Sequence, residues 1–453
     1  MPHNPPPMKK LFIKTYGCQM NVYDSARMAD LLAPIGYAPA DAAEDADMVI
    51  LNTCHIREKA VDKVYSELGR LREMKDARAG GDAPLLIAVA GCVAQAEGAE
   101  IIAREPAVDM VVGPQSYHRL PEMIAKISRE KGHALETDFP AQDKFDALPE
   151  ERSATGVSAF LTVQEGCDKF CTFCVVPYTR GAEYSRPVAQ IEAEARRLVE
   201  KGAREITLLG QNVNAYCGKG IGGGSLTQLI RRLAKIDGLA RLRFTTSHPR
   251  DFTRDIVQAI DAVPTLCDHV HLPVQSGSTA VLRAMSREYT REWYLERIAW
   301  IKAAKREISM TSDIIVGFPG ETEQDLEDTA TLLEEVKYDS VFAFKYSPRP
   351  NTPAIGMADS IPEEEKARRL QVILERQREV QRKSYTRHLG QVIEVMVEGH
   401  NTARGQVIGR SSQNKTVNFT VTHPILPATG SYAQVRITQT FPNSLAGEAV
   451  VVQ

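Results

Sequence analysis

Residues 166–174 read GCDKFCTFC, a loop that places three cysteines in C-x3-C-x2-C spacing. These are Cys167, Cys171 and Cys174, and the next cysteine along the chain is Cys217. Structural zinc sites and cubane iron–sulfur clusters usually take four protein ligands. A cubane held by three cysteines leaves one iron open to a small molecule. The spacing therefore indicates chemistry at a cluster.

Zinc is the alternative occupant of this loop. Three thiolates and a water could hold a catalytic zinc ion, but the loop supplies no acid or base for hydrolysis. Zinc-dependent nucleobase deaminases carry an H-x-E…P-C-x-x-C pattern, which this sequence lacks. A structural loop with this spacing by chance also stays open.

The chain has 453 residues, 43% of them hydrophobic and 25% charged, which predicts two or three soluble, well-packed domains. Its eight cysteines are too few for a disulfide scaffold, so metal binding or catalysis is favoured. No apolar run has the length of a membrane span and no secretory or transit signal is visible, so we expect a cytoplasmic protein without membrane contact. The net charge of −3 neither indicates nor excludes a polyanionic partner.

Six strand-then-helix units occupy the segment 153–385 that surrounds the cysteine loop. Each expected strand ends in a polar or Gly/Pro-rich motif, which predicts an incomplete (β/α)6 barrel with its chemistry at the carboxyl ends of the strands. The loop follows the first of these strands, where such a site belongs. The six strand candidates are SAFLTVQEG, EITLLGQNVN, LRFTTSHP, HVHLPVQSG, MTSDIIVGFPG and VFAFKYSPRP.

The segment 9–125 alternates apolar strands with helical patterns, as in a doubly wound parallel α/β sheet. Cys18, Cys54 and Cys92 each come directly after an apolar strand. Ligands bind at this edge of open α/β sheets, so the three side chains could converge in a second three-cysteine site. Three buried structural cysteines are the alternative. A polar stretch over 138–156 reads as a linker.

In the segment 387–450, polar and apolar residues alternate at period two between Gly, Asn and Pro turns, which predicts a small all-β barrel. The four strand candidates are QVIEVMVEG, GQVIGRS, KTVNFTV and YAQVRITQTF. Five basic residues from position 387 onward face three acids, a mild excess compatible with nucleic acid or with an ordinary solvated barrel. Phe419 could stack on a base, with Arg404, Arg410 and Lys415 on phosphates; a core position for Phe419 is the alternative.

The cysteine loop, with Phe173 before its last cysteine, resembles the signature of the radical S-adenosylmethionine (SAM) enzymes. The resemblance implies that Cys167, Cys171 and Cys174 hold a 4Fe-4S cluster. Its open iron would chelate SAM and yield a 5′-deoxyadenosyl radical.

Further motifs resemble the methylthiotransferases, and among them the MiaB type. YGCQMN (16–21), LNTCHIREKA (51–60) and AGCVAQ (90–95) look like their amino-terminal domain, and the last segment looks like a TRAM domain, an RNA-binding barrel. The core motifs are CTFCVVPYTRGAEYSR (171–186), LLGQNVNAY (208–216), TTSHP (245–249), LPVQSGS (272–278) and DIIVGFPGET (313–322). His55 departs from the small residue that is more usual there.

This resemblance implies an activity with two clusters. Cys18, Cys54 and Cys92 would hold an auxiliary 4Fe-4S cluster, one SAM would supply a methyl group and a second SAM the radical. The product would be 2-methylthio-N6-(dimethylallyl)adenosine next to the anticodon, at position 37 of tRNA. The expected partners are the anticodon stem-loop of a tRNA that carries N6-isopentenyladenosine and an electron donor such as a flavodoxin or ferredoxin, with the enzyme a monomer.

Other assignments are less specific. Arg180 and Arg186 could meet phosphate or the SAM carboxylate, or be solvated, and Cys217 and Cys267 match no ligand pattern and are expected to be structural. The catalytic residues beyond the cluster ligands are not indicated. Sibling enzymes acting on N6-threonylcarbamoyladenosine or a ribosomal protein aspartate, and a non-enzymatic iron–sulfur RNA-binding protein, stay open. The candidates for the SAM side, each of which could be an ordinary turn or cap, are Gln211, Asn212, Ser247, Gln275, Gly317, Gly320 and Glu321.

Overall fold

The computed structural model describes residues 8–55, 60–79, 84–130, 132–139, 144–152, 156–218, 224–422 and 426–452. They form two compact units. One contains the chain up to Ala154 with Glu165–Asp168 and Val175–Tyr184; the other contains Thr155–Gln164, Lys169–Cys174 and Ser185–Gln453. No described helix is long and apolar enough to cross a membrane.

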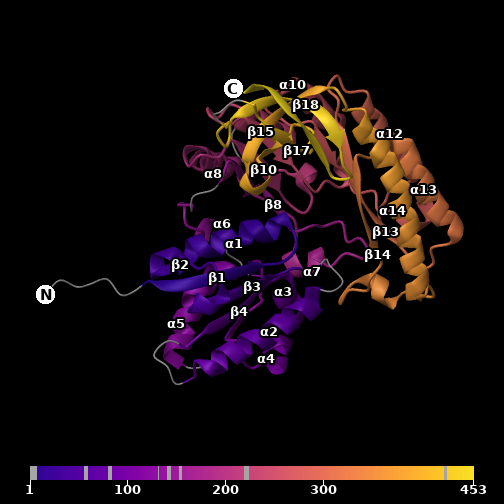
Figure 1. The fold of residues 1–453 in the computed structure, drawn as a ribbon. Helices are drawn as coiled ribbons and strands as arrows, with labels where there is room; N and C mark the ends of the chain where they lie inside the picture. Colours follow the sequence, from indigo (N-terminus) through magenta and orange to yellow (C-terminus); the bar gives the residue numbers. More distant parts are fainter. Residues whose placement is uncertain are drawn as a thin grey trace. The chain divides into compact units, whose positions relative to one another are not determined.

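The first unit is a sheet of six parallel strands in the order β2-β1-β3-β4-β5-β6, with α1 on one face and α2 on the other (Figure 1). Every residue of the central strand β3 is buried, as expected for a parallel strand covered on both faces. The strands are β1 (Lys9–Thr15), β2 (Tyr37–Pro39), β3 (Met48–Thr53), β4 (Leu86–Gly91), β5 (Met110–Val112) and β6 (Ala134–Glu136). The helices are α1 (Gln19–Leu32), α2 (Ala60–Ala77), α3 (Cys92–Glu97), α4 (Ala99–Arg104), α5 (Leu120–Glu130), α6 (Lys144–Ala147) and α7 (Val176–Arg180).

Part of the stretch expected to be a linker is ordered. The helix α6 lies within it, and its Lys144 is 2% exposed. Local composition does not reveal this burial, because the partners of Lys144 lie elsewhere in the chain. Residues 140–143 and 153–155 of the expected linker are outside the described residues.

The second unit contains the six predicted barrel strands, all parallel, in two three-stranded sheets. The strand orders are β11-β10-β7 and β12-β13-β14. An isolated parallel bridge joins Leu242 of β11 to Leu266, which lies shortly before β12. The strands are β7 (Ser158–Thr162), β10 (Glu205–Leu209), β11 (Arg241–Phe244), β12 (His269–His271), β13 (Ser309–Val316) and β14 (Ser340–Lys345). Separately, β8 (Gln164–Glu165) pairs with β9 (Tyr184–Ser185).

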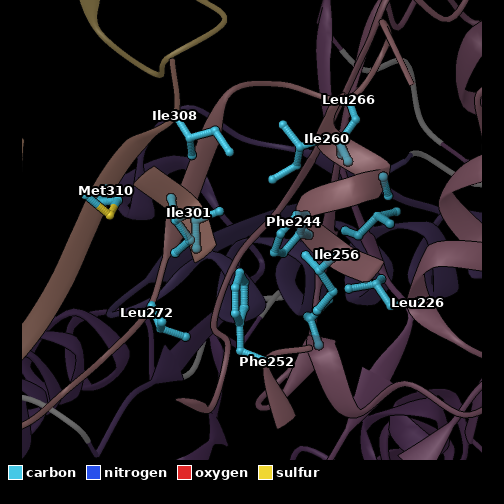
Figure 2. Packing of buried hydrophobic residues seen from close by; sticks show 14 of the residues in the cluster. Leu226, Phe244, Phe252, Ile256, Ile260, Leu266, Leu272, Ile301, Ile308 and Met310 are labelled. Carbon is cyan, nitrogen blue, oxygen red and sulfur yellow. The ribbon is translucent and has the colours of Figure 1, made fainter. Parts of the chain in front are cut away.

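Helices cover one face of these sheets, and α13 and α14 lie against each other beside β14 (Figure 1). Figure 2 shows the apolar core between the layers, where Phe244 of β11 lies among Phe252, Ile256 and Ile260. A capping box of Thr322 and Asp325 begins α13 directly after the GFPGE turn, a device that contributes about 1 kcal/mol. The helices are α8 (Val188–Glu200), α9 (Leu226–Leu233), α10 (Arg254–Ala262), α11 (Thr279–Ala284), α12 (Arg291–Lys302), α13 (Glu323–Val336) and α14 (Glu363–Thr386).

The last part of the second unit is a closed five-stranded barrel in the order β15-β16-β17-β19-β18. The sequence predicted four of its strands and missed β19. Phe419 is fully buried inside the barrel with Val395 and Val435, so its proposed stacking on RNA is wrong and its core position is confirmed. The strands are β15 (Val392–Asn401), β16 (Gln406–Ser411), β17 (Thr416–Thr420), β18 (Tyr432–Thr440) and β19 (Ser444–Val452).

Lys415 and Arg410 hold this barrel to the rest of the second unit. Lys415 is 2% exposed and its Nζ lies 2.5 Å from Oδ1 of Asp339, the residue immediately before β14. Arg410 pairs with Glu398, and its backbone carbonyl accepts a hydrogen bond from Arg241. The expected phosphate contact of Lys415 is therefore wrong, because its ammonium group is buried in an ion pair with a carboxylate of the same unit.

Candidate functional site

Cys18, Cys54 and Cys92 lie at one edge of the first unit's sheet. They follow β1, β3 and β4, which are adjacent strands of one parallel sheet, so their carboxyl ends meet as the sequence predicted. Cys18 is the N-cap of α1 and Cys92 is the first residue of α3. Backbone N–H groups at these helix starts favour thiolate charge.

Two glycines allow the strand ends to approach one another. Gly17 has φ +100°, and a Cβ on it would lie 2.1 Å from Cys54 Cβ and 2.6 Å from Cys54 Sγ. Gly91 has φ +89°, and a Cβ there would lie 2.4 Å from the carbonyl oxygen of Thr53. A side chain is excluded at both positions by backbone conformation and by contact. The absence of a side chain lets the Cys18 turn approach Cys54 and lets the start of α3 approach the end of β3.

The asparagines of the GCQMN and LNTC motifs fix the same edge. Asn21 Nδ2 donates to the carbonyl of Thr53 at 2.8 Å, and Asn52 Nδ2 donates to the carbonyl of Asn21 at 2.8 Å. Asn21 Oδ1 accepts from the Cys18 thiol at 3.6 Å. Both side chains are buried, so these bonds hold the Cys18 turn against the end of β3.

The surroundings favour negative charge on Cys18. Its hydrogen bond with Cys54, aided by the nearby Arg180 guanidinium, lowers its pKa to about 6 despite burial. Burial raises the pKa of Cys92, while Arg180 acts on it in the opposite direction.

Arg180 is fully buried in the first unit. Its Nη2 lies 2.7 Å from Asp24 Oδ2 and its Nη1 lies 2.6 Å from Glu165 Oε1. Lys144 also reaches Glu165, at 2.6 Å. Burial opposes the charge on Arg180, but Asp24 and the thiols of Cys92 and Cys18 outweigh it and raise its pKa. The solvated alternative for Arg180 is therefore wrong. Arg186 is also buried, paired with Glu194 at 2.8 Å in the second unit.

The GCDKFCTFC loop divides between the two units, and its parts are described by unit. In the first unit, Cys167 N donates to the carbonyl of Gly181 at 3.2 Å. In the second, Cys174 N donates to the carbonyl of Cys171 at 2.9 Å, which forms a tight turn. Thr172 is held at both its N–H and its hydroxyl, by the carbonyls of Met285 and Ala284.

Arg287 is a residue that the sequence analysis missed. Its Nη1 lies 3.4 Å from Cys171 Sγ and its Nη2 donates to the carbonyl of Pro273 at 2.8 Å. Burial opposes its charge, but Tyr289 and Cys171 outweigh burial and raise its pKa. The sequence offers little indication of this contact, because Arg287 is a single arginine in the turn after α11 and belongs to no motif.

The predicted SAM-side residues lie in the turns after β10 to β13. Asn212 Nδ2 bonds Asp251 at 2.7 Å, and Glu321 accepts from Gly317 N and Arg369, both at 2.9 Å, so these two side chains shape turns. Gln275 and Gly320 have positive φ, and Gln211 is half-buried.

Ser247 and His248 carry buried polar atoms that form no hydrogen bond with any other described residue. Both residues are buried, yet Ser247 Oγ and His248 Nε2 have no hydrogen-bond partner among the described residues. Burial, with help from Arg287 and Lys169, lowers the pKa of His248, so its ring is neutral. Buried polar atoms without partners are rare in folded proteins, and the donor set here fits a polar ligand such as SAM.

Three other cysteine and histidine assignments can be described. Cys267 is 3% exposed and fits a structural role, whereas Cys217 is exposed. His55 is buried next to Cys54.

Among the described residues, no three or more His, Cys, Asp or Glu side chains are already arranged around one metal-sized position. Both sets of cluster ligands therefore stay predictions.

The chain matches three known domain families. Residues 10–113 match the family described as uncharacterized protein family UPF0004, residues 161–333 the radical SAM superfamily, and residues 386–450 the TRAM domain. Membership of the radical SAM superfamily implies a 4Fe-4S cluster and SAM.

Solved structures share the fold at low sequence identity. The radical SAM methyltransferase TsrM from Kitasatospora setae, solved with cobalamin and a 4Fe-4S cluster, has a TM-score of 0.56 at 14% identity and covers 77% of this chain and 77% of its own. The cobalamin-dependent radical SAM enzyme OxsB has a TM-score of 0.51 at 13% identity, covering 83% of this chain and 56% of its own. These similarities support the fold alone.

Curated relatives match over nearly the whole chain. A protein of Koribacter versatilis is 52% identical over 446 residues, which is 98% of each chain. A protein of Cereibacter sphaeroides is 55% identical over 444 residues, 97% of this chain and 98% of its own. Both are named tRNA-2-methylthio-N(6)-dimethylallyladenosine synthase. At this identity and coverage, the chain belongs to the family of tRNA-2-methylthio-N(6)-dimethylallyladenosine synthases.

Proposed function

We propose that this chain converts N6-(dimethylallyl)adenosine next to the anticodon of tRNA into its 2-methylthio derivative, with one SAM as methyl donor and a second as radical source. The observation that carries this proposal is the presence of two separate sets of three cysteines in a chain more than 50% identical, end to end, to the named synthases. The reaction replaces an unactivated C–H bond on a purine ring.

The two sets of cysteines have separate tasks in this proposal. Cys167, Cys171 and Cys174 hold the 4Fe-4S cluster that binds SAM, and Cys18, Cys54 and Cys92 hold an auxiliary 4Fe-4S cluster. When bound, these groups supply radical and sulfur chemistry that acid–base side chains cannot perform. The protein's part is to bring the thiols together, stabilise their charge and exclude water. The abutting Gly17 and Cys54, and the buried guanidinium groups beside Cys92 and Cys171, support this assignment.

One sheet face of the second unit offers a surface for an unstacked base. Alternate residues of β13 and β14 pack into the helix-covered core, which leaves the opposite face for Asp313, Phe342 and Phe344. Phe342 is 54% and Phe344 44% exposed, and the ring of His271 lies edge-on to Phe342 at 6.1 Å. Aromatic side chains stack on single-stranded bases, and an apolar surface also suits an isopentenyl group.

The RNA contacts of the TRAM barrel, the location of the enzyme and its electron donor are part of the same proposal. The TRAM barrel contributes RNA contacts through its exposed side chains, Arg404 among them, since Lys415 and Phe419 are buried. The enzyme works as a cytoplasmic monomer and receives electrons from a flavodoxin or ferredoxin.

Expression in cells that lack their own methylthiotransferase but make N6-isopentenyladenosine tests the function. The tRNA is digested and its nucleosides are identified by mass spectrometry, with Cys174→Ala in a parallel culture. We expect the 2-methylthio isopentenyl nucleoside with the intact chain and not with the variant. If iron-loaded, folded protein leaves the nucleoside unchanged, the substrate assignment fails and the sibling substrates are tested next. Binding of tRNA without SAM consumption would instead identify an iron–sulfur RNA-binding protein.

A further inference from the structure

Each of the two sets of cysteines has a buried arginine beside it. In the first unit Arg180 ends α7, which packs against the helix α3 that begins at Cys92. In the second unit Arg287 Nη1 lies 3.4 Å from Cys171 Sγ. Both arginines are almost inaccessible to solvent; Arg180 is 3% exposed. Burying a guanidinium group costs several kcal/mol, which a nearby anion must offset.

The contacts of Arg180 fix its position within the first unit. Its two terminal nitrogens bind different carboxylates, Nη2 to Asp24 and Nη1 to Glu165. Nη2 also lies 3.3 Å from Asn21 Oδ1, the same oxygen that accepts from the Cys18 thiol. The guanidinium group therefore cannot turn away from the thiols without breaking a charge-assisted bond.

The formal charges of this network cancel. Asp24 and Glu165 carry two negative charges, and Arg180 and Lys144 carry two positive charges. Burial of such pairs adds little stability by itself compared with apolar packing. Arg180 is the member of this network that lies nearest the thiols by geometry: its Nη2 shares Asn21 Oδ1 with the Cys18 thiol, and α7, which ends at Arg180, packs against α3, which begins at Cys92.

We propose that Arg180 is a positioning residue for the auxiliary cluster: it orients the thiols of Cys18 and Cys92 and stabilises the negative charge of the cluster, which raises the reduction potential of that cluster. A cation near a redox centre favours its reduced, more negative state. This inference rests on the proposed function, because it requires a cluster on Cys18, Cys54 and Cys92. The three thiols at adjacent strand ends with a buried cation beside them fit such an anionic group.

The test uses the full chain with Cys167, Cys171 and Cys174 all replaced by Ala, so that only the auxiliary cluster can form. The protein is reconstituted anaerobically with iron and sulfide, its iron content is measured, and its midpoint potential is obtained by EPR-monitored titration. Arg180→Met is the main variant. We expect at least a tenfold shift of the cluster's oxidised-to-reduced ratio toward the oxidised form, which for one electron is about 59 mV toward more negative potential.

Three further variants separate the guanidinium group from its surroundings. Arg180→Met with Glu165→Gln restores a neutral network, and we expect it to keep the lowered potential. Arg27→Met is the control for a lost buried arginine, since Arg27 is 3% exposed and pairs with Asp30 at 2.8 Å. Its potential should be unchanged. If Arg180→Met does not fold, Arg180→Lys is compared with the parent protein alone. Lysine keeps the charge but cannot bind Asp24 and Glu165 at once, so we expect slower cluster assembly than in the parent protein, and equal assembly rates and potentials would then overturn the role of Arg180.

The outcomes distinguish the two proposals. A parent protein that binds no iron through Cys18, Cys54 and Cys92 contradicts the auxiliary cluster, and with it the proposed function. A normal cluster whose potential is the same in the parent, Arg180→Met and Arg180→Lys overturns the role of Arg180 alone. Recovery of the parent potential in the double variant also overturns it, because net charge would then be the cause.

Discussion

Gly17 shows how much a single backbone position contributes to the cysteine edge of the first unit. Its positive φ is strained for any other residue, and the Cys54 side chain occupies the space that a Cβ would need. Gly36 offers a matched comparison, because it has φ +90° but nothing lies within 4 Å of the place where a Cβ would stand.

Gly36→Ala should therefore lower the free energy of unfolding by about 1–2 kcal/mol through backbone strain alone. Gly17→Ala should lower it further and also reduce the iron bound by the protein, since Cys54 must move. Urea denaturation and iron analysis of the two variants measure both effects. Equal iron content in Gly17→Ala and the unaltered protein would show that the approach of Gly17 to Cys54 is not needed for the site.

Single residues also mark the limit of prediction from sequence. The six cysteines could be proposed as ligands because spacing and strand ends are local properties of the chain. The partners of Arg180 and the contact of Arg287 with Cys171 could not be predicted, because Asp24 lies 156 positions from Arg180 and Cys171 lies 116 positions from Arg287. Lys415 was assigned to phosphate for the same reason: its carboxylate partner, Asp339, is 76 positions away.

At the scale of elements, β14 gives the base-binding proposal its most direct test. Phe344→Ala removes an exposed ring from the face opposite the helices. Stacking on one base contributes about 1–3 kcal/mol, so the Kd for an anticodon stem-loop carrying N6-isopentenyladenosine should rise roughly 5- to 140-fold. Fluorescence anisotropy with a labelled stem-loop measures this change.

Phe344→Leu separates the two contributions of that ring. Leucine keeps an apolar contact for the isopentenyl group but cannot stack, so it should still discriminate the modified from the unmodified stem-loop. If both variants bind both RNAs as tightly as the unaltered protein does, this face of β14 does not contact the base.

The elements themselves were largely predictable. Each of the six barrel strands in the second unit was expected from an apolar run that ends in a polar motif, and the structure confirms them. The strand β19 was missed because its first half, SLAGE, mixes a glycine and an acid with apolar residues. Its parallel pairing with β17 closes the barrel, and no local pattern encodes such a pairing.

At the scale of the whole second unit, the Asp339–Lys415 pair fixes the TRAM barrel to the strand β14. Burial by itself would raise the pKa of Asp339, but Lys415, Ser384 and the N–H of Met310 outweigh it, so the pKa is lowered from its ordinary 3.8. A carboxylate with a lowered folded-state pKa stabilises the protein above its unfolded-state pKa, and this stability is lost as the pH falls through the folded-state value.

Asp339→Asn should therefore destabilise the barrel at neutral pH, by about 3–5 kcal/mol for a buried pair that loses one partner. The difference from the unaltered protein should shrink as the pH falls below 3.8. Hydrogen-exchange mass spectrometry of peptides from β15 to β18 measures the local stability, and Arg436→Gln, at an exposed barrel position, is the control. A difference that is independent of pH would contradict the charge-based attachment.

The placement of Val175–Tyr184 in the first unit has a consequence for inheritance and engineering. This short stretch lies between two segments of the second unit, yet its Arg180 pairs with Asp24 and Glu165 of the first. A chimaera of two relatives joined near residue 153 would combine the amino-terminal domain of one relative with the 175–184 segment, and so the Arg180, of the other. A chimaera of two relatives should therefore be active only if residues 175–184 come from the same parent as residues 9–152. The two segments would then evolve together although other residues separate them in the sequence.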